Sequence, residues 1–326
     1  MPAAGQAARG GIDLGGTKIE AVVVNARNKV LGSARHATPT GGGPAAVAKE
    51  LGATIQEAAK AAGLKTSELQ GIGIGSPGVI DSQSGSVSSA RNLPDWEGTF
   101  PLAPTLAKEV GAPAFIGNDV QVATDAEFRL GAGKPYKSIL GVFWGTGVGG
   151  GVILAGKPWL GRGGAGEIGH MVVKIGGARC TCGRKGCLEA YAGRGSMEAR
   201  ARRRYEKGRK TDLFKLMEDR GRTRLTSGIW AHALEHGDKL AKQIIDEAIR
   251  ALGGGVASAV NLLDVEAVVI GGGLGVRFGQ PYADRIAKAM QPHLFNDQHP
   301  PDVKVAALGD LGGAVGAALL AKQARP

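Results

Sequence analysis

Apolar runs that end on glycine are the most regular feature of this chain. Gly11–Asn25 reads as an apolar run, a glycine turn and a β-branched run, which predicts a hairpin, and Ser138–Leu154 has the same design. Because this strand–glycine–strand unit occurs twice, the pattern indicates two related halves.

Strands and helices alternate outside these hairpins. Further strands are expected at Val30–Ala37, Gly71–Gly78, Ala112–Val120, Glu266–Gly275 and Val303–Ala307. Helices are expected at Pro44–Ala62, from Asn118 to about Leu130, at Tyr282–Met290 and at Gly309–Gln323, with a mostly helical region over Glu189–Asn261. Such alternation predicts an α/β fold.

Length and hydropathy narrow the class of protein. At 326 residues the chain exceeds the size that one core serves efficiently, so we expect two lobes. No apolar run approaches the ~18 residues needed to span a bilayer, and the start, MPAAGQAARG, lacks the apolar region of a secretory signal. We therefore expect a cytoplasmic protein with reduced cysteines.

Composition adds two biases. The 55 glycines are typical of tight turns in which backbone approaches a ligand or another strand. The net charge of +11 is compatible with nucleic acid, polyphosphate or another anionic substrate. Much of this charge lies in Arg194–Lys210, which we interpret as a solvated helix face in preference to a polyanion contact.

The first glycine turn, DLGGTK, has the composition of a phosphate-binding loop. Gly15 and Gly16 allow backbone N–H groups to approach an anion closely, Thr17 adds a hydroxyl donor and Lys18 a cation. Asp13, at the end of the strand, is a candidate ligand for Mg²⁺ or its water shell. The alternative is an ordinary hairpin turn. It is not a Walker A loop, because no Gly-Lys-Ser/Thr follows.

Two later glycine segments extend the same prediction to a nucleotide. The second hairpin turn repeats the chemistry of the first, with Gly145, Thr146 and Gly147 at its tip. Two such loops suit a polyphosphate chain, and we expect them to bind the phosphates of ATP. A third glycine segment stands at the end of a later strand and consists of Gly271, Gly272 and Gly273. Its flat backbone could lie against a nucleotide base or ribose.

All three cysteines fall within eight residues, in the segment CTCGRKGC. One residue separates Cys180 from Cys182 and four separate Cys182 from Cys187, and His170 precedes Cys180 with nine residues between them. This spacing predicts a Cys₃His structural zinc site. A redox cysteine cluster is the alternative, although three thiols cannot all pair and no Cys-x-x-Cys is present.

The ordered motifs DLGGTK, NDV, GTGVGGG, GEIGH and CTCGRKGCLE resemble the ROK family of sugar kinases and repressors, within the actin-like ATPase superfamily. The resemblance covers roughly Gly11 to Ala321. It implies two α/β lobes, each on a ribonuclease-H-like mixed sheet, with the ligand cleft between them. We expect a small lobe over residues 1–117 with a C-terminal helix at 310–326 packed back on it, and a large, zinc-containing lobe over residues 118–309.

The resemblance also implies roles for single residues. Asp119 resembles the family's catalytic base, which would accept the proton of the sugar's primary hydroxyl; opening the next helix as an N-cap is the other reading, and both can hold. Asn118, Glu167, His170 and Glu189 resemble its sugar ligands. Carboxylates suit this task because each can accept two hydroxyl donors.

His170 would then have a double role, with one nitrogen on zinc and the other facing a sugar hydroxyl. Two residues, Gly78 in the SPG turn and Asn92 in ARNLPDW, lie where the family's small lobe closes on the sugar. Each is equally readable as an ordinary turn or loop residue.

The activity implied is transfer of phosphate from ATP, with Mg²⁺, to the 6-hydroxyl of glucose, since NLPDW resembles the family's glucokinases. Kinases of N-acetylmannosamine, N-acetylglucosamine or fructose are the alternatives; Val79 after Gly78, where acetyl-hexosamine kinases can carry arginine, favours glucose. ATP is preferred over polyphosphate as the donor.

A sugar-sensing repressor is a more distant alternative. Repressors of the family carry a helix-turn-helix segment ahead of the first phosphate loop, and only about ten residues precede the first strand here. We therefore expect no nucleic-acid partner and no membrane partner. Family members are often homodimers, and Arg200–Gly237 is a candidate dimer face.

Overall fold

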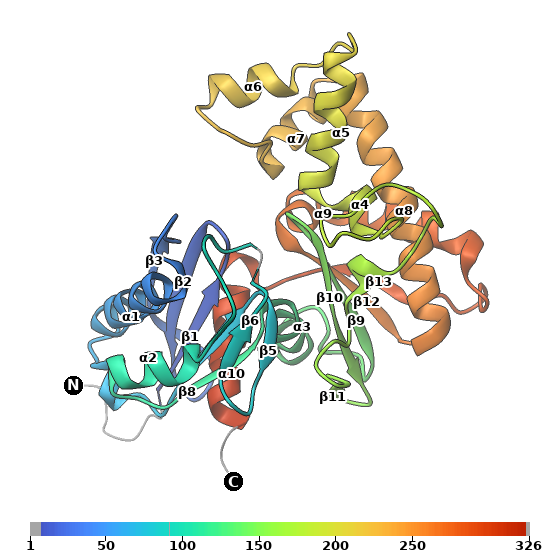
Figure 1. Ribbon diagram of the computed structural model, residues 1–326. Coiled ribbons are helices and arrows are strands. Elements are labelled where there is room, and N and C mark those ends of the chain that lie inside the picture. Colours follow the sequence, from blue (N-terminus) through green and yellow to red (C-terminus); the bar gives the residue numbers. More distant parts are fainter. Residues whose placement is uncertain (1–7, 91, 324–326) are drawn as a thin grey trace. The chain divides into compact units, whose positions relative to one another are not determined.

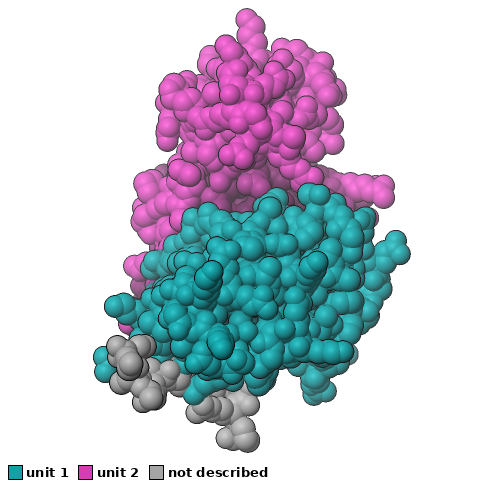
Figure 2. All heavy atoms as spheres, turned by 90° about the vertical axis from the view of Figure 1, so that its left-hand side faces the viewer, with its two compact units in different colours: residues 1–131, 158–165, 307–326 teal, residues 132–157, 166–306 magenta. Residues whose placement is uncertain are grey.

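The computed structural model describes residues 8–90 and 92–323, which form two compact units (Figure 2). Unit 1 comprises residues 1–131, 158–165 and 307–326, and unit 2 comprises residues 132–157 and 166–306. Mixed sheets flanked by helices confirm the expected α/β class. Within the described residues, no helix combines the length and apolar character that crossing a bilayer requires.

A five-stranded mixed sheet forms the centre of unit 1 (Figure 1). Its strand order is β3-β2-β1-β4-β8, in which β1, β2 and β3 are antiparallel and β1, β4 and β8 are parallel. The bounds are β1 Arg9–Leu14, β2 Lys18–Val24, β3 Val30–Ala37, β4 Ile72–Ser76 and β8 Ala114–Asn118. The β1–β2 hairpin and the strand at Val30–Ala37 are therefore confirmed.

Helices cover both faces of this sheet. Consecutive residues of β1 point to opposite faces, so Gly10 faces Ile55 of α1 while Gly11 faces Ala314 of α10. The helices are α1 Gly43–Ala61, α2 Leu102–Val110, α3 Asp119–Leu130 and α10 Gly312–Gln323, with short 3₁₀ turns at η1 Thr66–Glu68 and η4 Gly309–Leu311. A small antiparallel sheet joins β5 Val79–Asp81, β6 Ser86–Ser88 and β7 Thr99–Phe100.

Unit 2 repeats the design of unit 1. Its five-stranded sheet has the order β11-β10-β9-β12-β13, again with an antiparallel hairpin followed by parallel neighbours. The bounds are β9 Ile139–Trp144, β10 Val148–Leu154, β11 Lys157–Pro158, β12 Ala267–Gly271 and β13 Asp302–Val305. Shared strand order and direction are what two related halves would show.

The expected helical region of unit 2 is also present. It contains α4 Glu189–Ala192, α5 Arg194–Glu206, α6 Leu213–Asp219, α7 Ser227–Glu235 and α8 Lys239–Leu263, and the remaining elements are α9 Gly272–Met290 and the 3₁₀ turns η2 Ile168–His170 and η3 Gln291–His293. The buried side chains of Trp144 and Trp230 pack with α8 in the core of this unit.

The start of α9 differs from the prediction at Tyr282. The helix begins ten residues earlier, at Gly272, and is interrupted by Gly279 with φ 67° just before Pro281. Glycine and proline have the lowest helix propensities, so the sequence pattern gave no helical signal before this break. The segment Gly271–Gly273 is therefore a helix start and not a flat loop.

The basic run on α5 is only partly a solvated face. Arg202 and Arg203 are exposed, as expected for a solvated helix. Arg200, however, donates to the carbonyl oxygens of Ala190 (2.7 Å) and Tyr191 (2.6 Å), and Arg204 pairs with Glu247 of α8 at 2.9 Å. These two arginines thus connect α5 to α4 and α8.

The predicted boundary between the two lobes, between residues 117 and 118, would place α3 in the large lobe. In the structure α3 packs on α10 and on β4, and so it belongs to unit 1. The C-terminal helix α10 packs on β1 and β4 of the same unit (Figure 1). Residues 324–326 lie outside the described residues.

The contact of α10 with the sheet depends on two glycines. A Cβ at Gly11 would lie 2.0 Å from the carbonyl oxygen of Ala314, and one at Gly73 would lie 1.7 Å from that of Ala317. Any side chain at these positions would push the helix away from the sheet, because the contact is to backbone that cannot rotate aside.

Gly73→Ala is expected to reduce the free energy of unfolding by about 2–3 kcal/mol, because its methyl group would overlap the backbone of α10. Gly254→Ala on α8 is the matched control: its Cβ would meet open space, so the substitution should stabilise the protein by up to ~1 kcal/mol. Urea titration followed by circular dichroism measures both variants. Equal stability of the two would contradict this packing.

Candidate functional site

The predicted residues of unit 1 gather at one edge of its sheet. Asp13 of β1 is in register with Gly75 of β4, and Ser76 of β4 with Asn118 of β8. Because these strands are parallel, their carboxyl ends meet at the same edge, where open α/β sheets bind ligands. A Cβ at Gly75 would lie 3.5 Å from the Cα of Asp119, so this residue belongs to the same edge.

Asp13 lies in an environment that opposes its ionisation. Burial raises the pKa of Asp13 to about 6; the facing Glu20 carboxylate adds to this rise and Lys18 opposes it. Glu20 is buried and directly opposite Asp13 in the β1–β2 register. A divalent cation would favour the ionised form, so the side chain fits a Mg²⁺ role chemically.

Lys18 is not an isolated cation of the first glycine loop. Its Nζ forms a short ion pair with Glu20, which also accepts a hydrogen bond from Nε of Arg35 at 2.8 Å. Arg35 in turn lies 3.6 Å from Asp310. Part of the positive charge that we assigned to a phosphate is therefore shared with a buried carboxylate.

The glycine turn of unit 1 is held closely against neighbouring backbone. Gly15 donates to the carbonyl oxygen of Lys18 at 2.9 Å, and the hydroxyl of Thr38 donates to Gly15 at 2.6 Å. A Cβ at Gly16 would lie 2.8 Å from the carbonyl oxygen of Asn92, so the turn and Asn92 are neighbours. The structure thus brings together two segments that lie 76 positions apart.

Gly78 occupies a strained backbone position in unit 1. Its φ is 102°, and a Cβ there would lie 2.7 Å from the carbonyl oxygen of Ser88. Only glycine fits without strain, which accounts for the residue structurally. Its part in sugar binding remains a prediction.

Asn118 and Asp119 divide two tasks at the start of α3. Asn118 is the N-cap, because its Oδ1 accepts the N–H groups of Val120 and Gln121, each at 3.1 Å. Asp119 is the first helical residue, and its Oδ1 accepts from Val120 at 2.9 Å. The cap is therefore Asn118 and not Asp119, and the helix start fixes the backbone of the proposed base.

In unit 2 the second glycine turn is attached to α5. The N–H groups of Arg194 and Gly195 donate to Gly145 and Thr146, each at 3.1 Å. Gly272, with φ 77°, lies against Trp144: a Cβ there would be 2.6 Å from the Trp144 carbonyl oxygen. A Cβ at Gly145 would lie 3.8 Å from N of Gly273, so the turn and the start of α9 are adjacent.

Glu189 connects this glycine turn to the cysteine segment. Its Oε2 accepts the N–H of Val148 and its Oε1 accepts the hydroxyl of Thr181, both at 3.0 Å. A Cβ at Gly147 would lie 2.2 Å from Oε2, so only glycine leaves room for the carboxylate. Oε2 has a second lone pair that remains suitable for a sugar hydroxyl, whereas Oε1 also accepts from the Cys180 thiol at 3.8 Å.

The three thiols and His170 converge as a metal site requires. Their ligand atoms all lie within 4.8 Å of one another, with Cys180 Sγ 3.9 Å from His170 Nδ1 and Cys182 Sγ 3.8 Å from Cys187 Sγ. Ligands on one tetrahedral Zn²⁺ lie about 3.6–3.8 Å apart, given its usual bond lengths. The three cysteines are free, and 3.8 Å is far beyond a disulfide bond.

Two turns aim the cysteines at this centre. The N–H of Cys180 donates to Arg184 at 2.8 Å, and that of Gly183 donates to Cys180 at 3.0 Å. Gly183 and Gly186 have φ of 90° and 85°, which close the loop between the second and third thiols. The glycines in CTCGRKGC are thus needed for the loop's shape.

The thiols differ in how readily they ionise. Burial raises the pKa of Cys180 to about 12. At Cys182 burial also acts to raise the pKa, but the Arg184 N–H and the thiols of Cys180 and Cys187 outweigh it and lower the pKa to about 6. Cys182 therefore ionises first, and a thiolate is the form that binds metal.

His170 presents its two nitrogens to different partners. Nδ1 faces Cys180, and Nε2 lies 3.9 Å from Oε2 of Glu167. Both residues are accessible enough to meet a ligand, since the side chains of His170 and Glu167 are 36% and 58% exposed. A metal held by Nδ1 would fix the ring and leave Nε2 beside a carboxylate.

Two site residues were missed by the sequence analysis. Thr181 holds Glu189, and Arg194 donates from Nη2 to the hydroxyl of Thr146 at 2.9 Å. Thr181 carried no signal, because a threonine between two cysteines reads as a spacer. Arg194 was grouped with the basic run that follows it.

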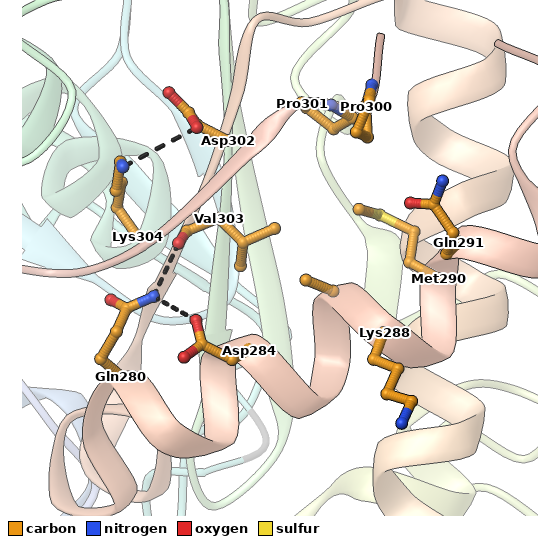
Figure 3. A pocket seen from close by; sticks show the side chains of 11 residues that line it. Gln280, Asp284, Lys288, Met290, Gln291, Pro300, Pro301, Asp302, Val303 and Lys304 are labelled. Atoms are coloured by element: carbon orange, nitrogen blue, oxygen red, sulfur yellow. Dashed lines mark hydrogen bonds and ion pairs between the residues drawn. The ribbon is translucent and has the colours of Figure 1, made fainter. Parts of the chain in front are cut away.

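A hollow of about 450 Å³ lies elsewhere in unit 2, between α9 and β13 (Figure 3). Several of its polar groups are paired within the protein: Nε2 of Gln280 donates to Asp284 at 2.8 Å and to Val303 at 2.9 Å, and Lys304 lies 3.8 Å from Asp302. It includes none of the predicted site residues, so we assign it no function.

Comparison with known proteins gives the same family over almost the whole chain. The ROK family profile matches residues 9–324. The glucokinase of Thermotoga maritima is 32% identical over 318 residues, which cover 96% of each chain. A ROK family glucokinase from Streptomyces griseus, solved in complex with glucose and AMPPNP, superposes with a TM-score of 0.83 at 32% identity, covering 98% of this chain and 100% of that one.

A ROK hexokinase from Thermus thermophilus superposes with a TM-score of 0.78 at 33% identity, covering 97% of this chain and 98% of that one. These structures share the two-sheet design described above. The fold class expected from the sequence, that of the actin-like ATPases, is therefore confirmed.

Asp13→Asn is expected to raise the melting temperature at pH 7–8 and to leave it unchanged near pH 4. The folded pKa of about 6 lies above the ordinary 3.8, so stability that is present below pH ~4 is lost as pH rises through ~6, by about 3 kcal/mol. Thermal melts across pH in magnesium-free buffer measure the difference.

Asp81→Asn is the control of opposite sign. Hydrogen bonds from Ser84 and Gln83 lower the pKa of this exposed carboxyl, so its stabilisation is present at neutral pH and is lost as pH falls. The substitution should not stabilise the protein at pH 7–8. If Asp13→Asn also failed to stabilise it there, the ionised Asp13 would carry no unfavourable burial.

Proposed function

This chain belongs to the ROK family, and we propose that it is an ATP-dependent glucokinase that phosphorylates the 6-hydroxyl of glucose. One observation carries the proposal. His170 lies next to the carboxylate of Glu167, a group suited to bind sugar hydroxyls, and it also belongs to the cluster of three cysteines that could hold a metal. The glucokinases at about 30% identity over nearly the full length support the same activity.

Asp119 acts as the general base in this proposal. A carboxylate within hydrogen-bond reach of the 6-hydroxyl accepts its proton as the oxygen attacks the γ-phosphorus. Asn118 caps α3 through Oδ1, so its Nδ2 is the group that would donate to a sugar hydroxyl. The rigid helix start limits the positions that both side chains can take.

Sugar recognition falls to Glu167, His170 and Glu189 of unit 2, with Gly78 and Asn92 of unit 1 as further proposed contacts. Glu189 accepts hydrogen bonds from the protein on both oxygens, which orients it before a sugar arrives. A hexose that lacks a hydroxyl would leave one of these acceptors unpaired, and that is how such a site discriminates.

Zn²⁺ is the metal that best fits His170, Cys180, Cys182 and Cys187, since three thiolates and an imidazole form a closed structural set. All four ligands come from the protein, so the ion would hold the loop and the imidazole without activating water. Asp13 is the proposed contact for Mg²⁺, which would offset charge on the nucleotide phosphates.

The glycine turns are the proposed nucleotide contacts. Gly15, Gly16, Thr17 and Lys18 in unit 1 and Gly145, Thr146 and Gly147 in unit 2 offer backbone and hydroxyl donors to phosphate oxygens. The start of α9, at Gly271, Gly272 and Gly273, adds the backbone N–H groups of the first helical turns, ahead of the break at Gly279. This replaces the flat base-binding surface that we expected there.

Three further expectations stay predictions. The small- and large-lobe roles of units 1 and 2 follow the family resemblance. Homodimer formation through Arg200–Gly237 requires measurement of the molar mass in solution. A cytoplasmic location would give the enzyme ATP and keep the thiols reduced.

The test of this function is the release of ADP from ATP with a panel of sugars. We expect glucose to support the fastest turnover and Asp119→Asn to lower kcat by ~10² or more, because the amide cannot accept the proton. Calorimetry should still detect glucose binding to this variant, since the amide keeps most of the side chain's shape.

Asp297→Asn removes a carboxylate from an exposed position outside the site and should leave kcat unchanged. Near-normal turnover of Asp119→Asn would remove Asp119 from the mechanism. Faster turnover with N-acetylmannosamine, N-acetylglucosamine or fructose would replace glucose as the substrate, and turnover with polyphosphate alone would replace ATP as the donor.

Cys182→Ala is expected to lose the bound zinc and to raise KM for glucose, because His170 and the loop that holds Glu189 lose their anchor. We expect about one zinc per wild-type chain by elemental analysis, and ~10–100-fold weaker sugar affinity in the variant. Thr181→Val, which removes the Glu189 contact but no ligand, should keep its zinc. A zinc-free wild-type protein with full activity would contradict this link.

A further inference from the structure

Arg194 lies beside the glycine turn of unit 2, and its side chain contacts that turn directly. Its Nη2 donates to the hydroxyl oxygen of Thr146 at 2.9 Å, while its own N–H donates to Gly145 at 3.1 Å. Arg194 is the first residue of α5, so the helix fixes its backbone. The guanidinium is therefore held at the tip of the turn.

The charge of this guanidinium is not matched by a close carboxylate. None of the ion pairs formed within residues 8–90 and 92–323 includes Arg194. The nearest acidic group along the helix, Glu198, accepts the N–H of Leu225 at 2.9 Å and lies 3.5 Å from Arg202. An anion at the turn would supply the missing negative charge.

A second arginine adds to the positive field. Burial lowers the pKa of Arg194; the charge of Glu198 opposes this effect and that of Arg224 adds to it. Arg224 is exposed and precedes α7, whose Ser227 hydroxyl lies 3.7 Å from the position of a Cβ on Gly273. The turn, the start of α9 and these two arginines therefore form one basic region of unit 2.

The direction of the hydrogen bond from Arg194 determines whether the Thr146 hydroxyl can donate to another group. Because the guanidinium occupies a lone pair of the hydroxyl oxygen, the hydroxyl hydrogen is left to donate elsewhere. Phosphate oxygens accept such bonds, and the remaining N–H groups of Arg194 can reach the same anion. Guanidinium matches phosphate geometry with two parallel bonds, which an ammonium cannot do.

We propose that Arg194 binds the phosphate chain of the donor nucleotide together with Thr146, and that it orients the Thr146 hydroxyl toward those phosphates. The proposal rests on the nucleotide-binding part of the function given above. It names Arg194 as a positioning and binding residue whose effect falls on the nucleotide and not on the sugar.

The test compares Arg194→Ala with Arg194→Lys and with Arg203→Ala. Arg203 is an exposed arginine of the same helix, nine positions further along, so it controls for the loss of one positive charge from α5. Each variant is assayed for KM of ATP, KM of glucose, kcat and melting temperature. Binding of ADP is measured by calorimetry without sugar.

Arg194→Ala is expected to raise KM of ATP and Kd of ADP by ~10–100-fold, the usual value of a lost hydrogen bond to a charged group. KM of glucose should change by less than about twofold, and Arg194→Lys should recover only part of the loss, because it restores the charge but not the bidentate geometry. In the double variant Arg194→Ala/Thr146→Val the losses should be smaller than their sum, since the two side chains act together.

Unchanged ADP affinity in Arg194→Ala would overturn the proposal, as would equal losses for ATP and glucose or full recovery by lysine. The calorimetric arm needs no turnover. If the wild-type protein phosphorylated no hexose yet bound ADP in an Arg194-dependent way, the proposed glucokinase activity would fail while this inference held. A wild-type protein that bound no ADP would overturn the inference itself.

Discussion

The Glu189 carboxylate holds together the glycine turn and the cysteine loop of unit 2, to which we assign the chemistry. One oxygen accepts from the backbone of Val148, immediately after the glycine turn, and the other accepts from Thr181, within the cysteine loop. The turn can come this close only because residue 147 has no side chain. A carboxylate held at both oxygens cannot rotate freely, so one residue places the turn, the loop and the group that we propose as a sugar ligand. His170 belongs to the same arrangement, since the thiols face one nitrogen and Glu167 the other. In the proposed function, recognition of the sugar would thus depend on a loop that a metal would hold.

Both units use the same physical device to expose backbone to a ligand. Antiparallel hairpins lie next to parallel strands, and glycines stand where the strands end. In unit 1 this arrangement has a cost, because Asp13 faces the buried Glu20 across the hairpin and its pKa is raised to about 6 by burial first and by that carboxylate second. On the same sheet, Gly11 and Gly73 let α10 pack directly on the strands.

The sequence predicted most of the fold because its signals were local. Alternating apolar runs and glycine turns identified both hairpins, and Val30–Ala37 matches β3 at both ends. The convergence of Cys180, Cys182 and Cys187 with His170 also followed from spacing.

The sequence analysis missed several other features of the structure. The start of α9 was missed because glycine and proline hide a helix whose stability comes from packing. Pairing of Arg194 with Thr146 depends on how distant segments meet, which no local pattern specifies. Lys18 and Glu20, by contrast, stand two positions apart on β2 and share a face, so their pairing had a local signal that the sequence analysis overlooked. The cap reading was attached to Asp119, whereas Asn118 is the cap, because either side chain can fill that position and only the backbone decides.

The central claim is that a metal-bound imidazole, oriented by three thiolates, presents its second nitrogen to the sugar beside Glu167. A crystal structure of the protein with glucose, with anomalous data collected at the zinc absorption edge, tests it most directly. The account predicts one zinc peak bonded to His170 Nδ1 and to the sulfurs of Cys180, Cys182 and Cys187, with Nε2 within hydrogen-bond distance of a glucose hydroxyl. The absence of a metal peak, coordination through Nε2, or glucose bound away from His170 would contradict it.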